Sequence, residues 1–251
     1  MEPFSFTSYI WVWNRKKFKA GKLDRMNKAA ILVAGGKGTR MGTARSKQFL
    51  EIGGLPVLMH TIKAFLQAEP KLDLILVLPQ DQFLLWEELC QEFRFDLSHR
   101  IVAGGASRFQ SVKNGLNAVN FDRGVVAIHD GVRPFVSKKV IQESFRIAEA
   151  QGSAIPVISL KDSIRKVSSD GGSEFQDRQV FRLVQTPQTF QLEKIKQAFL
   201  TPESDQFTDD ATVYEAMGWQ VTLFEGYPEN IKITTPEDLE YGDFLFYRQQ
   251  K

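Results

Sequence analysis

Two hydrophobic runs that end abruptly in small and charged residues constrain this chain most strongly. They are AAILVAGGKGTRMG at 29–42 and VVAIHDGVRPF at 125–135. A near-continuous apolar run is typical of a parallel strand buried on both faces, and such strands carry polar chemistry at their carboxyl ends. Together the two runs predict an α/β fold and indicate a protein that handles nucleotide phosphates.

From Lys28 onward, strand-like and helix-like patterns alternate. Their order is AAILVA, PVLMHTIKAFLQA, LDLILVLP, FLLWEELCQEF, RIVAGG, RFQSVKNGLNAV and GVVAIHD. This alternation predicts parallel crossover units and a doubly wound, mostly parallel, Rossmann-like sheet. We therefore expect residues 28–251 to form a single domain.

A polar stretch interrupts this alternation at about 158–184. SSDGGSEFQDRQVF within it predicts a hairpin-like arm that is too short to fold alone, so we expect it to pack on a partner. Regular patterns then resume, and the last segment predicts a helix that begins at Pro236.

Composition excludes several classes of protein. The chain has 251 residues, 43% of them hydrophobic, and a formal net charge of +2. That charge gives no surplus for binding nucleic acid, and no apolar stretch approaches the roughly 20 residues that span a bilayer. Cys90 is the only cysteine, so an intrachain disulfide is impossible and a reducing, cytoplasmic location is expected.

The first 27 residues differ from the rest of the chain. FSFTSYIWVW is aromatic, and the basic segment RKKFKAGKLDR follows it. A secretory signal has the opposite order. We expect an extension at 1–27 that is disordered or not native to the fold, with Met26 as the working start. An interfacial anchor and an extra packing element are the alternatives.

Two interpretations of the glycine-rich turn remain open, and two known nucleotide-binding motifs do not fit it. Gly35, Gly36 and Gly38 surround Lys37, so backbone amides can approach a phosphate chain closely. The dinucleotide fingerprint requires glycine where Met41 stands, and the phosphate-loop pattern is absent. A plain tight turn also remains open.

Seven ordered motifs carry a resemblance to a known family. AGGKGTRMG and SKQFLEIGGLPVL at 46–58 are similar to the nucleotide-binding signature of sugar and polyol nucleotidyltransferases. GGASRFQSV at 104–112, HDGVRPF at 129–135, QTPQTF at 185–190, TDDA at 208–211 and NIKITTPEDL at 230–239 resemble one branch in order and spacing. That branch is the 2-C-methyl-D-erythritol 4-phosphate cytidylyltransferases of the non-mevalonate isoprenoid pathway. The resemblance begins near Lys28.

The resemblance implies that CTP reacts with methylerythritol phosphate to give the CDP-alcohol and pyrophosphate. A phosphate monoester is mostly dianionic at neutral pH, so no general base is needed. The protein then has to position two polyanions and neutralise developing charge. Mg²⁺ bound mainly through the CTP phosphates is the expected cofactor.

Residue by residue, the family pattern implies that Arg40 and Lys47 hold the phosphates. The positions implied to hold the cytosine, the ribose and the phosphate chain are Ala34, Gly35, Gly36, Gly38, Gly105, Ser111 and Gly131. Many branch members carry alanine at the positions of Gly35 and Gly131, and glycine preserves the small volume. Ser111 is alternatively a helix cap.

Asp130 matches the carboxylate near both the metal and the substrate, although HDGVRP is also a good turn. The resemblance implies that, together with Asp130, four further residues bind the polyol phosphate: Arg133, Ser163, Thr186 and Thr208.

Arg178 and Lys232 match positions that bind the substrate phosphate and orient it for attack. The resemblance implies that Arg178, which lies on the arm, comes from the second subunit. The resemblance therefore implies a homodimer with shared active sites. For Asp209 and Asp210, a metal site and a helix cap remain open, and we favour the cap.

Three alternative functions remain at this level. Ribitol 5-phosphate cytidylyltransferases share much of the motif set, but the TDDA segment favours methylerythritol phosphate. A non-catalytic CTP-binding module is the second alternative. Such a module would not need both Arg40 and Lys47 for the CTP phosphates, nor Arg178 and Lys232 for the substrate phosphate. A hexosamine 1-phosphate uridylyltransferase is disfavoured by the spacing beyond HDGVRPF.

Overall fold

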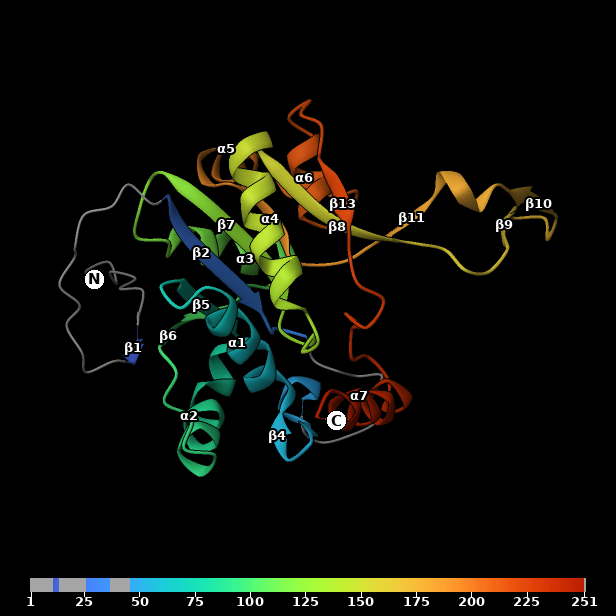
Figure 1. Ribbon diagram of the computed structural model, residues 1–251. Helices are drawn as coiled ribbons and strands as arrows, with labels where there is room; N and C mark the ends of the chain where they lie inside the picture. Colours follow the sequence, from blue (N-terminus) through green and yellow to red (C-terminus); the bar gives the residue numbers. More distant parts are fainter. Residues whose placement is uncertain (1–10, 14–25, 37–45, 251) are drawn as a thin grey trace, which may run out of the picture.

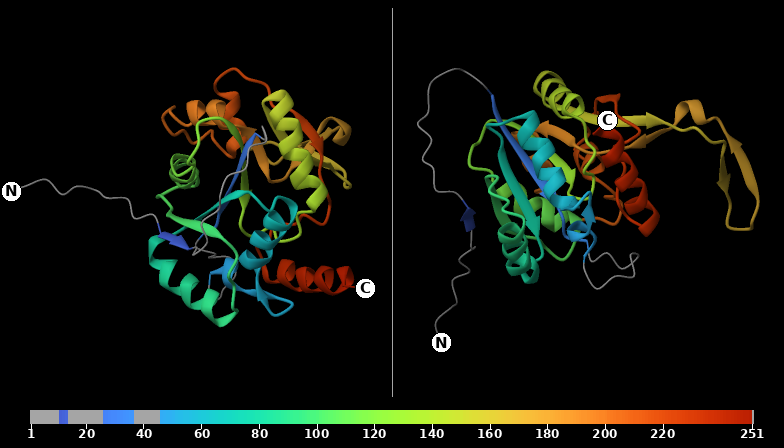
Figure 2. Two further views of the ribbon diagram at one scale, coloured as in Figure 1. Left: turned by 60° about the vertical axis from the view of Figure 1, so that its left-hand side comes forward. Right: turned by 60° about the horizontal axis from the view of Figure 1, so that its bottom comes forward.

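A single sheet with helices on both faces forms the body of the protein (Figures 1 and 2). The computed structural model describes residues 11–13, 26–36 and 46–250. The nine strands follow the order β1-β6-β5-β2-β7-β12-β8-β11, with β13 beside β8. They are β1 (Trp11–Trp13), β2 (Asn27–Val33), β5 (Asp73–Leu78), β6 (His99–Ala103), β7 (Gly124–Asp130), β8 (Ser153–Ser159), β11 (Arg182–Val184), β12 (Gln188–Gln191) and β13 (Leu223–Glu225).

Strand directions match the predicted fold class. The neighbours β6, β5, β2 and β7 are parallel, and β12 runs antiparallel between β7 and β8. The prediction of a doubly wound, mostly parallel sheet is confirmed. Parallel pairing brings the carboxyl ends of β2, β5, β6 and β7 to one edge.

Two hydrophobic cores lie on opposite faces of the sheet. Because successive side chains of a strand point to opposite faces, Ala30 and Leu32 join one core and Ala29 and Ile31 join the other. The helices are α1 (Val57–Ala68), α2 (Phe83–Glu92) and α4 (Lys138–Gln151) at the first core, and α3 (Arg108–Asn117), α5 (Leu192–Ala198) and α6 (Asp210–Glu215) at the second. No helix within 26–36 and 46–250 is long and apolar enough to cross a membrane.

A small third core surrounds the C-terminal helix α7 (Pro236–Gln249). The helix begins at Pro236 as predicted, and Thr235 and Asp238 form a capping box. Leu245 packs with Ile52 of the short hairpin β3 (Glu51–Ile52) and β4 (Leu55–Pro56), and with Ile233. This core therefore joins the segments that carry Lys47 and Lys232.

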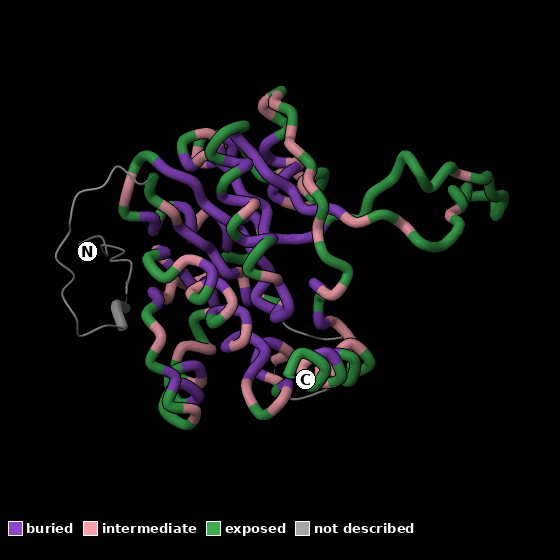
Figure 3. The backbone as a smooth tube through the Cα atoms, viewed as in Figure 1, coloured by how far each residue is buried: buried purple, intermediate pink, exposed green. Residues whose placement is uncertain are grey.

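An exposed arm projects from the end of β8 (Figures 1 and 3). It contains the antiparallel hairpin β9 (Ile164–Val167) and β10 (Ser173–Gln176), and the single turn η4 (Arg178–Val180). β11 then returns to the sheet beside β8, so residues 160–181 form the projecting part. Every residue from 161 to 184, in the arm and in β11, is at least partly exposed to solvent.

The N-terminal extension is described only in part. β1 pairs antiparallel with β6, with Trp11 opposite Ile101. Residues 1–10 and 14–25 lie outside the described residues, so the expectation for most of this extension stays a prediction.

Candidate active site

A cleft of about 240 Å³ lies at the carboxyl ends of β2, β6 and β7. It is formed by residues 33–36, 47, 48, 105–108, 111, 130, 132 and 232. Backbone hydrogen bonds hold the turns that follow the strands, because Ala34 N donates to Val77 O and Gly131 N donates to Val33 O, both at 2.9 Å. The cleft therefore collects most of the predicted nucleotide positions: Ala34, Gly35, Gly36, Gly105 and Ser111.

Ser111 supports the turn that contains Gly105. Its hydroxyl donates to Ser107 O at 2.8 Å and accepts from Gly105 N at 3.1 Å. The expected alternative role of Ser111 as a helix cap belongs instead to Ser107, which accepts from Gln110 N. A Cβ atom placed on Gly105 would lie 2.3 Å from Gln110 Cβ, so this position has no room for a side chain.

Gly131 and Gly35 sit in different surroundings. A Cβ atom on Gly131 would lie 3.0 Å from both Ala34 Cβ and Leu58 Cδ1, whereas one on Gly35 would meet nothing closer than Ser111 Oγ at 3.8 Å. Gly131 therefore lies at a close approach between two strand ends, where a methyl group would displace its neighbours by a few tenths of an ångström. Gly35 has space for the alanine that the family pattern favours.

Asp130, at the end of β7, organises the cations of the cleft. Its Oδ2 atom accepts from Arg133 Nε at 3.1 Å and lies 3.1 Å from Lys232 Nζ. Burial would raise the pKa of Asp130, but Lys232, Arg108 and Arg133 hold it well below its usual range. The carboxylate is therefore ionised at neutral pH.

Lys47 belongs to a second group of polar residues, on the single turn η2 (Lys47–Phe49). A Cβ atom on Gly36 would lie 3.7 Å from Lys47 Cε, so the lysine stem passes close to the glycine-rich turn. The neighbouring Gln48 is buried, and its Nε2 donates to Ala34 O and to Gln82 Oε1, both at 2.9 Å. Gln48 thus fixes η2 to the end of β2, a role that its place in SKQFL did not reveal.

His129 and Thr186 form a buried layer beneath Asp130. Thr186 Oγ1 lies 3.0 Å from His129 Nδ1 and accepts from Asp130 N at 3.2 Å. Burial lowers the pKa of His129 to about 4. His129 is therefore neutral at pH 7, and its ring nitrogens are engaged by Thr186 and by the carbonyl oxygen of Arg133.

Arg133 connects this layer to the loop before Lys232. Its Nη1 donates to Asn230 O at 2.9 Å, and Asn230 Nδ2 donates to Thr186 O at 2.7 Å. Arg133 is thus held by Asp130 and Asn230, and its side chain is only 13% exposed. Asn230 is a further positioning residue that the sequence did not indicate.

Arg108 and Asp210 form an unexpected pair beside the cleft. Arg108 donates from Nη1 and Nη2 to the two carboxylate oxygens of Asp210, at 2.8 and 2.6 Å. Asp209 caps α6, as favoured from the sequence, through a capping box with Thr212.

Several predicted residues are not brought into this cleft. Ser163 and Arg178 lie on the exposed arm, which projects away from the body, and Thr208 is exposed next to Asp209. Gly38 and Arg40 lie outside the described residues.

The described residues provide no protein cage for a metal. No group of three or more His, Cys, Asp or Glu side chains in 26–36 and 46–250 could hold an ion. Asp130 is the carboxylate that lines the cleft, and its Oδ1 atom accepts no hydrogen bond within these ranges. One carboxylate fits a Mg²⁺ ion whose other ligands are phosphate oxygens and water.

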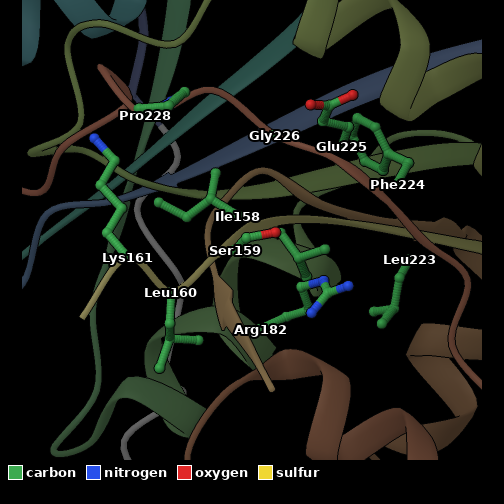
Figure 4. Close-up of a pocket in the computed structure, with 11 residues that line it drawn as sticks. Ile158, Ser159, Leu160, Lys161, Arg182, Leu223, Phe224, Glu225, Gly226 and Pro228 are labelled. Atoms are coloured by element: carbon green, nitrogen blue, oxygen red, sulfur yellow. The ribbon is translucent and has the colours of Figure 1, made fainter. Parts of the chain in front are cut away.

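A larger hollow of about 560 Å³ lies at the base of the arm (Figure 4). Figure 4 shows that Ile158–Lys161 and Arg182 line it from the β8 and β11 side, and Leu223–Gly226 from the β13 side. It contains none of the predicted site residues. The smaller cleft, where the strand ends and the cations converge, is therefore the candidate active site.

Comparisons with known proteins identify the family of the chain. The model of the family described as 2-C-methyl-D-erythritol 4-phosphate cytidylyltransferase matches residues 28–248. A protein of that name from Bacteroides thetaiotaomicron is 50% identical over 220 residues, which cover 88% of this chain and 100% of the relative. Its namesake from Bacteroides fragilis is 51% identical over 220 residues, with the same coverage of both chains.

Solved structures show the same architecture. The 4-diphosphocytidyl-2C-methyl-D-erythritol synthase from Anaerococcus prevotii superposes with a TM-score of 0.77 at 28% identity, covering 89% of this chain and 97% of that one. The 2-C-methyl-D-erythritol 4-phosphate cytidylyltransferase from Thermus thermophilus gives 0.70 at 29% identity, covering 88% and 98%.

Proposed function

The chain belongs to the 2-C-methyl-D-erythritol 4-phosphate cytidylyltransferase family, and we propose that the cleft at the ends of β2, β6 and β7 is its active site. The reaction joins CTP and 2-C-methyl-D-erythritol 4-phosphate to give 4-CDP-2-C-methyl-D-erythritol and pyrophosphate. The relatives carry this name, so the ribitol phosphate and non-catalytic alternatives are not favoured.

The arrangement of cations around Asp130 carries the assignment to this cleft. Lys232 and Arg133 contact its carboxylate, Arg108 lowers its pKa, and Lys47 lines the same cleft. Positive groups fixed in advance stabilise charge that develops on transferred and departing phosphates. The site can therefore bind two polyanions next to each other.

The attacking group needs no protein base. A phosphate monoester has its second pKa near 6, so it is largely dianionic at pH 7. The buried, neutral His129 is engaged by Thr186 and by a backbone carbonyl, which suits a supporting role. Catalysis then comes from positioning and charge neutralisation.

In this proposal the nucleotide lies along the turns that follow the strands. The cytosine and ribose contact Ala34, Gly35, Gly105, Ser111 and Gly131. Gly36 and Gly38 let backbone amides approach the triphosphate. Lys47 and Arg40 neutralise charge on the α-phosphate and the departing pyrophosphate.

The polyol phosphate binds on the side of Asp130 and Lys232, with Arg133 and Thr186 supporting it. Arg178, Ser163 and Thr208 act across a homodimer, in which the arm of one subunit reaches the cleft of the other. Support comes from the exposed apolar side chains of the arm, including Phe175 and Val180, because such residues need a partner surface.

Magnesium would be held by the CTP phosphates and Asp130, and when bound it would withdraw charge from the phosphate oxygens. We further propose that residues 28–251 act as one unit, that 1–27 form an appended extension, and that the protein is cytoplasmic. The single cysteine, Cys90, is buried and free, which suits a reducing compartment.

Substitution of Lys47 tests the assignment of the cleft. Lys47→Ala should lower kcat by about 100-fold or more while changing CTP affinity much less, since its contact strengthens as charge develops. Steady-state kinetics and CTP binding separate the two effects. Lys63→Ala, an exposed position on α1, serves as the control. A change confined to KM would contradict the proposed role of Lys47.

A further inference from the structure

Arg108 and Asp210 form an asymmetric ion pair. Arg108 is the first residue of α3 and Asp210 the first residue of α6, and two hydrogen bonds of 2.8 and 2.6 Å join them. Asp210 is fully buried, whereas the Arg108 side chain keeps 34% of its surface exposed. Arg108 also lines the cleft. The carboxylate is therefore on the inside, and the guanidinium is next to the space where ligands enter.

The position of Asp210 is fixed by its neighbours. Gln188 of β12 donates from Nε2 to Asp209 Oδ2 and accepts from Ala211 N through Oε1, both at 2.8 Å. Asp209 and Thr212 add the capping box of α6. The start of α6 is thus tied to the sheet, so Asp210 holds Arg108 in one orientation.

Arg108 keeps unused hydrogen-bonding capacity. A guanidinium has five N–H groups, and Asp210 accepts from two of them. Within 26–36 and 46–250 the remaining N–H groups have no acceptor. The planar fork of arginine matches the oxygens of a phosphate, and it loses little entropy when a carboxylate already fixes it.

We propose that Arg108 is a further phosphate-binding residue of this active site, and that the buried Asp210 is its positioning residue. This inference rests on the proposed function. It adds one more cation to the site, Arg108 at the start of α3, which is held by Asp210. The ligand group is a phosphate, supplied either by the CTP triphosphate or by the polyol phosphate. Nearby charge agrees, since Arg108 helps Lys232 and Arg133 to lower the pKa of Asp130 against the effect of burial.

Three variants test the proposal. Arg108→Met removes the charge and keeps the length, Arg108→Lys keeps the charge without the fork, and Asp210→Asn leaves Arg108 without its charged partner. Arg146→Met is the matched control, because Arg146 makes a similar pair with Glu143 at 2.9 and 2.5 Å on the exposed side of α4. KM and kcat are measured for each substrate with Mg²⁺, and calorimetric titrations measure the binding of CTP alone and of methylerythritol phosphate alone.

Arg108→Met should raise the KM and Kd of one phosphate ligand about 10- to 100-fold, the effect expected for one charge-assisted hydrogen bond. The ligand whose Kd rises is the source of the phosphate. Arg108→Lys should fall between Arg108→Met and the wild type. Asp210→Asn should raise the same constants by less, and Arg146→Met should change none of them.

Unchanged KM and Kd in Arg108→Met, with only a lower melting temperature, would overturn the proposal and leave the pair as a link between α3 and α6. If Asp210→Asn or Arg108→Met fails to fold because it leaves a buried group unpaired, Arg108→Lys decides the question alone, since it keeps a cation beside the buried Asp210. A wild-type protein that binds both ligands without turnover would contradict the proposed function, and the titrations would still test Arg108.

Discussion

Gly35 follows β2 and Gly105 follows β6 at the same edge of the sheet, but only Gly105 is tightly packed against its surroundings. We expect Gly105→Ala to destabilise the protein by about 1–3 kcal/mol and to weaken CTP binding, because the new methyl group would push against Gln110 and shift the turn. Gly35→Ala is the matched control and should leave both properties nearly unchanged. Urea unfolding and CTP titration measure the two effects. Equal behaviour of the two variants would contradict the packing argument.

At the scale of residues, the sequence predicted the site residues that lie together in one motif directly after a strand. Asp130 and Arg133 are three positions apart in HDGVRPF, both were predicted as site residues, and they form an ion pair. Arg108 and Asp210 are separated by 102 positions. Such a pair depends on how α3 and α6 pack, which local patterns do not encode. Gln48 and Asn230 were missed for the same reason, because Gln48 bonds to Ala34 and Gln82 and Asn230 bonds to Thr186, all on other segments of the chain.

At the scale of elements, the proposed role of the arm requires a second subunit. If each cleft uses the arm of the other subunit, a mixture of Arg178→Ala and Lys47→Ala chains should form some dimers with one intact site. We expect the mixture to recover up to about a quarter of wild-type activity, since random pairing places half of the chains in mixed dimers. Specific activity after joint unfolding and refolding measures this recovery.

Each variant refolded alone is the control for that experiment. Activity in the mixture no greater than the sum of the separate variants would mean that Arg178 serves its own chain, or that it serves no cleft.

Elements were predicted better than their arrangement. The start of α7 followed from Pro236 and the acidic residues after it, and the capping box bears this out. Its place against the β3–β4 hairpin did not follow. Gly53 has a φ of +55° and lies so close to the Phe246 ring that a Cβ atom there would be 2.0 Å away. A contact of this kind depends on tertiary packing across most of the chain.

For the whole molecule, lowering the pH should reduce the free energy of unfolding before most carboxylates become protonated. Burial lowers the pKa of all three histidines, and that of His129 falls from 6.5 to about 4. Between these values the unfolded chain binds more protons than the folded one. Stability is therefore fully present above about pH 6.5 and is lost as the pH falls toward 4. His129 alone should account for about 3 kcal/mol of this loss.

Urea unfolding at intervals from pH 7.5 to 4.5 measures this dependence. His129→Asn should have a shallower decline in the free energy of unfolding across that range than the wild type. The same slope in both proteins would show that His129 is not the group that titrates.

The parallel sheet, the cleft at its edge and the family match together assign one reaction to this chain, and pyrophosphate release tests it most directly. The purified protein is incubated with CTP and Mg²⁺, together with either 2-C-methyl-D-erythritol 4-phosphate or ribitol 5-phosphate. We expect pyrophosphate to be released with the first substrate, in equal amount to the CDP-alcohol formed, and far more slowly with the second. Turnover with ribitol 5-phosphate alone, or none with either substrate, would contradict the account.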